Sequence, residues 1–135
     1  MPSPINVLVV EDHQDTCDVL AVFLEVLGHH YKLATSAASA LDLAAVENFD
    51  LLLTDVQLGG RDGWALIRDL REQGCLPPLI ASMSAGYGPT QTARSKAEGC
   101  NWHLVKPFHW HELQVIMEKV DDAHELGGEL GRLGP

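Results

Sequence analysis

The sequence is poor in basic residues and contains no long apolar run, and each shortage excludes a class of protein. Its 135 residues hold 9 lysines and arginines against 19 aspartates and glutamates, for a net charge of −10, and the basic residues are scattered. Binding to a phosphate backbone needs clustered Lys and Arg, so we expect no direct contact with nucleic acid. No apolar stretch approaches the roughly 18 residues that a membrane-spanning helix requires, so we expect no membrane association.

Cysteine is also scarce. Cys17, Cys75 and Cys100 are odd in number and far apart along the chain, which argues against a disulfide framework and fits a reducing compartment. The N-terminal MPSPINVLVVED lacks the basic region that precedes the apolar core of a signal peptide. We therefore expect a cytoplasmic protein, and the length favours one domain with a sizeable core.

Five short apolar runs alternate with segments of helical periodicity. The expected strands cover residues 5–10, 30–34, 51–55, 78–84 and 102–105, and the expected helices about 17–27, 37–47, 63–73, 89–98 and 109–120. Strands rich in Val, Leu and Ile that alternate with helices predict an α/β fold, a doubly wound five-stranded parallel sheet with helices on both faces. We expect the domain to occupy residues 1–122 and a glycine-rich tail to occupy 123–135.

Charged and hydroxyl side chains stand at the ends of these strands, where a doubly wound sheet binds its ligands. They are Glu11 and Asp12 after the first strand, Asp55 at the end of the third, Ser82 and Ser84 in the fourth, and Lys106 after the fifth. Three carboxylates at one edge repel one another unless a cation lies between them. Carboxylates, carbonyl oxygens and water are the ligands that Mg²⁺ prefers, so the pattern predicts a magnesium site.

The third strand, LLLTD, is apolar until it ends on Asp55. A carboxylate is a competent nucleophile toward phosphorus, and phosphoryl transfer asks a protein mainly for positioning and charge neutralisation. Lys106 supplies a mobile positive charge suited to a phosphate oxygen. We therefore expect Asp55 to accept a phosphoryl group.

Four motifs in order, VLVVEDH, LLLTDVQLGGRDGW, LIASMSAGY and HLVKPF, resemble the receiver domain of two-component response regulators, in particular of the chemotaxis type. The resemblance covers roughly residues 5 to 120. It implies a flavodoxin-like fold with five helices, whose five strands follow the order 2-1-3-4-5. It also implies a phosphoprotein that catalyses its own Mg²⁺-dependent phosphorylation and dephosphorylation, rather than an enzyme of ordinary turnover.

The resemblance assigns a role to each matching acidic residue. Asp55 corresponds to the phosphoacceptor. Glu11 and Asp12 correspond to the acidic pair that holds Mg²⁺, with Asp12 as a direct ligand and Glu11 acting through water. The backbone carbonyl of Gln57, two residues after the phosphoacceptor, is expected to be a further metal ligand.

The same comparison assigns the phosphoryl contacts and the switch. Ser84 and Lys106 match the family's hydroxyl and its lysine, which precedes a proline expected in the cis form, and His103 stands at the switch position. In the family a histidine kinase or phosphotransfer protein phosphorylates the aspartate, the hydroxyl moves inward, and the switch residue rotates into the vacated space. The surface of the fourth helix, fifth strand and fifth helix then binds a downstream protein or a second copy of the chain.

Several alternatives stay open at this level. His103 replaces the usual Tyr or Phe, so it is either a titratable, weakened switch or an exposed ring with a packing role only. Gln57 and Gly86 stand at the two variable positions that tune dephosphorylation in the family, so the phosphoryl lifetime is left open. A receiver that is never phosphorylated would be a constitutive protein-interaction module. A dehalogenase-type hydrolase is disfavoured, because it needs a second acid where Gln57 stands.

Two further features lie beside these motifs. Gly59 and Gly60 follow Asp55 where the family often has proline, so we expect an irregular, more mobile loop. Cys100 and His109 belong to a group of possible metal ligands near the C-terminus whose spacing matches no closed zinc pattern, so we expect a solvated face there. The chain is expected to be either a stand-alone regulator or the N-terminal receiver of a longer protein.

Overall fold

The computed structural model describes residues 4–85 and 89–125, in which five parallel strands form one sheet in the order β2-β1-β3-β6-β7. These strands are β1 (Asn6–Val10), β2 (His30–Ala34), β3 (Leu51–Asp55), β6 (Leu79–Ser84) and β7 (Trp102–Val105). The helices are α1 (Gln14–Val26), α2 (Ala37–Val46), α3 (Gly63–Glu72), α4 (Pro89–Ala97) and α5 (Trp110–Glu125). Counting only the strands of this sheet, the order is 2-1-3-4-5, so the predicted fold class is confirmed.

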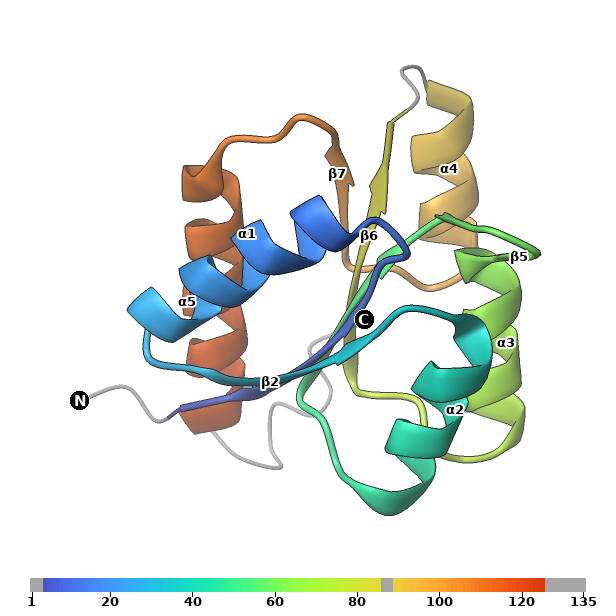
Figure 1. Ribbon diagram of the computed structural model, residues 1–135, viewed down its shortest axis with the longest axis horizontal. Coiled ribbons are helices and arrows are strands. Elements are labelled where there is room, and N and C mark those ends of the chain that lie inside the picture. Colours follow the sequence, from blue (N-terminus) through green and yellow to red (C-terminus); the bar gives the residue numbers. More distant parts are fainter. Residues whose placement is uncertain (1–3, 86–88, 126–135) are drawn as a thin grey trace.

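Helices cover both faces of the sheet, with α1 and α5 on one face and α2, α3 and α4 on the other (Figure 1). Successive side chains of a strand point to opposite faces. In β1, Val7 and Val9 pack with the core residues of α1 and α5, whereas Leu8 and Val10 pack with those of α2 and α3. This double coverage explains why the strands read as continuous apolar runs.

Helix α3 begins immediately beside the end of β3. Its N-cap, Asp62, accepts a hydrogen bond from the backbone N–H of Ala65 at 2.6 Å. A Cβ added to Gly63 would lie 2.2 Å from the backbone oxygen of Asp55, far inside van der Waals contact. Glycine at position 63 therefore allows the helix and the strand end to approach closely.

The segment after Asp55 is more regular than its two glycines suggested. Strand β4 (Gln57–Leu58) pairs with β5 (Arg61–Asp62) in a small antiparallel hairpin. Gly59 takes up the turn with a φ of 52°, a conformation that glycine adopts without a steric penalty. The sequence did not predict this hairpin, and the greater mobility expected of the segment stays a prediction.

The C-terminal helix is longer than its apolar pattern indicated. Helix α5 buries Leu113, Ile116, Met117 and Val120 and continues to Glu125, past the expected end near residue 120. The division of the chain at residue 122 into domain and tail stays a prediction. Within residues 4–85 and 89–125, no helix has the length and apolar character needed to cross a membrane.

Candidate functional site

Asp55 ends β3 at the carboxyl edge of the sheet, where its side chain is 7% exposed. Its Oδ1 accepts a hydrogen bond from the backbone N–H of Gln57 at 2.8 Å. Its Oδ2 lies 2.5 Å from the ammonium nitrogen of Lys106. The first contact orients the carboxylate from the start of the hairpin, and the second pairs it with a cation. The strand thus ends in a fixed, ion-paired carboxylate.

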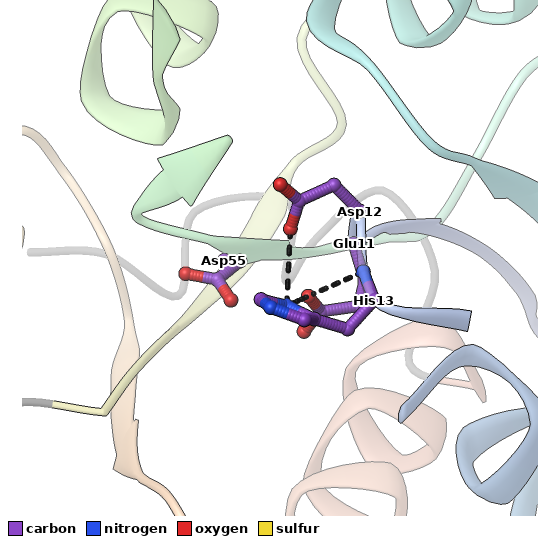
Figure 2. A group of neighbouring side chains, drawn as sticks. All are labelled: Glu11, Asp12, His13 and Asp55. Atoms are coloured by element: carbon purple, nitrogen blue, oxygen red, sulfur yellow. Dashed lines mark hydrogen bonds and ion pairs between the residues drawn. The ribbon is translucent and has the colours of Figure 1, made fainter. Parts of the chain in front are cut away.

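Glu11 and Asp12 follow β1, the strand that pairs with β3. Glu11 is fully buried, with Oε1 2.5 Å from Lys106 Nζ and Oε2 3.1 Å from His13 Nδ1. The Asp12 side chain is partly exposed, and its Oδ1 lies 3.2 Å from the same imidazole nitrogen. Figure 2 shows these two carboxylates, the imidazole and Asp55 gathered around one small volume. The structure therefore brings together the three acids that the sequence placed at one edge.

Lys106 follows β7 and joins the two buried carboxylates of the site, Glu11 and Asp55. Burial lowers the pKa of the ammonium, but hydrogen bonds and attraction from Asp55 and Glu11 outweigh this, so the pKa lies above its ordinary value. The backbone N–H of Lys106 also donates to the carbonyl of Ser84 at 2.7 Å. The peptide bond to Pro107 is cis, as expected from the motif.

His13 is a member of the site that sequence reasoning missed. Its pKa is raised by the hydrogen bond to Glu11 first, and then by the negative charge of Asp12. The available signal was the imidazole standing directly after the acidic pair in VLVVEDH. The ring is largely exposed and contacts both acids of the pair.

The acidic cluster fits a divalent cation. One ligand atom from each of Glu11, Asp12, His13 and Asp55 lies within 4.8 Å of the others. Carboxylate oxygens dominate this set, which suits a hard cation such as Mg²⁺. Gly59 lies beside this cluster without crowding it, since even an added Cβ would be 3.8 Å from Asp12 Oδ2, an ordinary van der Waals distance. The residues present therefore fit the predicted magnesium site.

Ser84 and His103 lie next to each other, on β6 and β7. The hydroxyl of Ser84 is buried, and its Oγ is 2.9 Å from His103 Nε2. The imidazole is only partly exposed, and burial lowers its pKa. The interpretation of His103 as an exposed packing ring is therefore wrong, because the ring is hydrogen-bonded to the site hydroxyl. Its role as a switch stays a prediction.

Other sequence-based expectations have different outcomes. Gln57 contacts Asp55 through its backbone N–H, and the expectation that its carbonyl binds metal stays a prediction. Gly86 lies outside the described residues. Among the described residues, the group of possible metal ligands consists of Glu11, Asp12, His13 and Asp55 and does not include Cys100 or His109.

Comparison with known proteins relates this chain to two-component systems. The sensor protein EvgS of Escherichia coli K12 is 29% identical over 126 residues, which cover 93% of this chain but only 10% of EvgS. The chain thus spans a tenth of the length of that relative.

Two solved structures extend the comparison. The receiver domain of sensor histidine kinase PA1611 from Pseudomonas aeruginosa PAO1, solved with magnesium in its active-site cleft, is 25% identical with a TM-score of 0.77, covering 89% of this chain and 99% of that one. The Saccharomyces cerevisiae receiver domain of Ssk1, in complex with the phosphotransfer protein Ypd1, gives 26% identity and a TM-score of 0.79, covering 90% and 92%. The family described as "Response regulator receiver domain" matches residues 7–118. The chain therefore belongs to the receiver domain family of two-component systems.

Proposed function

We propose that Asp55 accepts a phosphoryl group in a Mg²⁺-dependent reaction and that the chain works as a phosphorylation switch. The observation that carries this proposal is the environment of one carboxylate. Asp55 is oriented by a backbone N–H at 2.8 Å, paired with Lys106 at 2.5 Å, and next to two further acids that could hold a cation. A nucleophile, a cationic partner and a cation site thus meet at one strand end.

Each residue has a distinct part in this reaction. Asp12 and Asp55 would hold Mg²⁺ directly, Glu11 through water, and Gln57 through its backbone carbonyl. The bound ion would neutralise negative charge on the phosphoryl oxygens. An Asp55 oxygen forms a bond to phosphorus as the P–N bond of a phosphohistidine breaks, and the imidazole leaves with the electron pair.

The two remaining side chains act on the transferred group. Lys106 exchanges its contact with the Asp55 carboxylate for a phosphoryl oxygen, and the Ser84 hydroxyl donates to another. Water later hydrolyses the acyl phosphate.

A histidine kinase or phosphotransfer protein is the proposed donor. Helix α1 begins at Gln14, beside the acidic pair, and carries a stripe of exposed Val19, Val22 and Val26. Trp110 of α5, also exposed, extends this apolar surface. Exposed apolar residues that share one surface support docking of another protein. The proposed output is a changed α4–β7–α5 surface that binds a downstream protein or a second copy of the chain.

Binding of beryllofluoride, a stable mimic of a phosphoryl group on a carboxylate, tests this proposal. We expect the folded wild type to bind beryllofluoride only with Mg²⁺ present, as measured by ¹⁹F NMR. Asp55→Asn should lose binding, while Asp42→Asn, which changes an exposed carboxylate on α2, should retain it. Failure of the folded wild type to bind would instead favour a receiver that is never phosphorylated and acts as a constitutive interaction module.

A further inference from the structure

Helix α4 is held to the sheet by polar contacts. Ser95 is the buried residue of α4, and no side chain of this helix belongs to the two apolar core clusters. Beneath it, Ser82 of β6 is in register with His103 of β7. Side chains two residues apart on a strand point to the same face. The side chains of Ser82 and Ser84 therefore lie on one face of the sheet, together with that of His103.

Ser95 is the meeting point of several hydrogen bonds, and the Cys100 thiol also bonds to it and to Ser82. Its Oγ accepts from the indole N–H of Trp64 at 3.0 Å, because an indole nitrogen can only donate. The same oxygen lies 2.8 Å from Ser82 Oγ and 3.2 Å from His103 Nδ1. Arg94, the preceding residue of α4, stacks on the Trp64 ring with its guanidinium carbon 4.7 Å from the centroid. Helix α3 thus also contacts α4 through Trp64.

The imidazole of His103 connects this cluster with the site. Nδ1 lies 2.7 Å from Ser82 Oγ, and Nε2 lies 2.9 Å from Ser84 Oγ. A neutral imidazole carries one proton, so one nitrogen donates while the other accepts. Burial lowers the pKa of the ring, which favours this neutral form. If Nε2 changes from hydrogen-bond acceptor to donor, or the reverse, Nδ1 therefore takes the opposite role toward Ser82 and Ser95.

We propose that Ser82, Ser95 and Trp64 form with His103 a polar relay that positions helix α4 according to the state of the Ser84 hydroxyl. The inference rests on the proposed function, because the phosphoryl group is what would draw Ser84 into a new hydrogen bond. When Ser84 donates to a phosphoryl oxygen, the bond at His103 Nε2 changes and the bonds at Nδ1 rearrange. Ser95 attaches α4 to the Nδ1 side of His103, so the helix shifts when these hydrogen bonds rearrange.

Ser82, Ser95 and Trp64 are positioning residues in this account, since none of them touches the reacting atoms. The relay therefore differs from a switch in which the ring at position 103 acts through packing alone. A packing switch depends on the volume left behind Ser84, whereas the relay depends on hydroxyl and N–H groups that can be deleted singly. The indole N–H of Trp64 is then a reporter of events at Asp55.

NMR of the full chain, titrated with beryllofluoride and Mg²⁺, tests the relay. In the wild type we expect shifts of the Trp64 indole N–H and of the α4 amides on binding. In Ser95→Ala these shifts should fall about threefold or more, because the hydrogen bonds to α4 are lost. Thr92→Ala, which removes an exposed hydroxyl from the same helix, should leave them unchanged.

Trp64→Phe is the second variant, used because Ser95→Ala could fail to fold. It deletes the N–H donor and retains an aromatic ring beside Arg94, and the α4 shifts should again fall. Beryllofluoride occupancy at Asp55, read by ¹⁹F NMR, should stay within about twofold of wild type in the relay variants, since their sites are intact. Full occupancy with wild-type α4 shifts in both variants would overturn the relay and leave the proposed function standing. No occupancy in the wild type would overturn both.

Discussion

At the scale of single residues, the site depends on balanced charge. Three carboxylates lie together with one partly buried ammonium and one imidazole, and Lys106 contacts the two carboxylates that are buried. Ion pairs of this kind need both partners, because a buried charge left alone is costly. Lys106 is therefore expected to stabilise the fold as well as take part in phosphoryl transfer.

Lys106→Gln should lower the free energy of unfolding by about 1–3 kcal/mol, since Glu11 and Asp55 lose their cationic partner. Added Mg²⁺ should recover more stability in this variant than in the wild type, because a cation at the carboxylates replaces the missing charge. Urea unfolding with and without Mg²⁺ measures both effects. Lys119→Gln, an exposed substitution on α5, is the control. Equal stability of the wild type and Lys106→Gln would contradict this account.

Two histidines should make stability dependent on pH. Burial lowers the pKa of His103, and burial also lowers that of His29, against the opposing charge of Asp121. The unfolded chain binds protons at a pKa of about 6.5. Below that value, and down to the folded pKa, the unfolded state binds more protons at these two histidines, so they lower the stability as the pH falls. His13, whose pKa is raised, acts in the opposite sense, because its contribution to stability is lost as the pH rises.

His103→Gln should reduce this loss, because glutamine does not titrate. Urea unfolding at several pH values between neutral and mildly acidic measures the slope. His111→Gln, at an exposed position of α5, should keep the wild-type slope. The same slope in His103→Gln as in the wild type would show that His103 does not contribute.

At the scale of elements, the close contact of α3 with the end of β3 depends on Gly63. Gly63→Ala should lower the free energy of unfolding by about 1–3 kcal/mol, because its Cβ would overlap the Asp55 backbone oxygen. Gly60→Ala, in the turn of the preceding hairpin and with no atom within 4 Å of the added Cβ, should have little effect. Chemical denaturation compares the two. Similar losses in both variants would mean that the approach of α3 is not limited by Gly63.

Sequence patterns predicted most elements because apolar periodicity follows burial closely. The strands were evident since the sheet is covered on both faces. The end of α1 was also predicted closely, near residue 27, where Gly28 with φ 84° follows the helix. The β4–β5 hairpin was missed because two-residue strands carry too little periodicity to detect. The burial of Ser95 was also missed, because a serine in a polar helix gives no sign that it faces the sheet.

At the scale of the whole molecule, a parallel sheet explains why the site could be assembled from sequence. Parallel strands end at one edge, so Asp12, Asp55 and Lys106 meet there although they are far apart along the chain. Trp64 did not follow from this rule, since it lies on α3, and His13 was missed although it directly follows the acidic pair. Their contacts depend on how side chains pack across loops and helices, which strand order alone does not specify.

The helices also differ in how they are attached to the sheet. Apolar clusters hold α1 and α5 on one face and α2 and α3 on the other, whereas α4 is attached through serines and an imidazole. Hydrogen bonds are directional and can exchange partners, while a close-packed apolar core resists rearrangement. The molecule thus combines an apolar core on both faces with one helix suited to respond to the site.

The mass of the intact protein after incubation with acetyl phosphate, with and without Mg²⁺, tests whether Asp55 is a phosphoacceptor. We expect a gain of one phosphoryl group that requires Mg²⁺, is absent in Asp55→Asn, and is kept in Asp42→Asn. Peptide mapping should place the group on Asp55. A folded wild type that gains no phosphoryl group, or Asp55→Asn that gains as much as the wild type, would contradict the account.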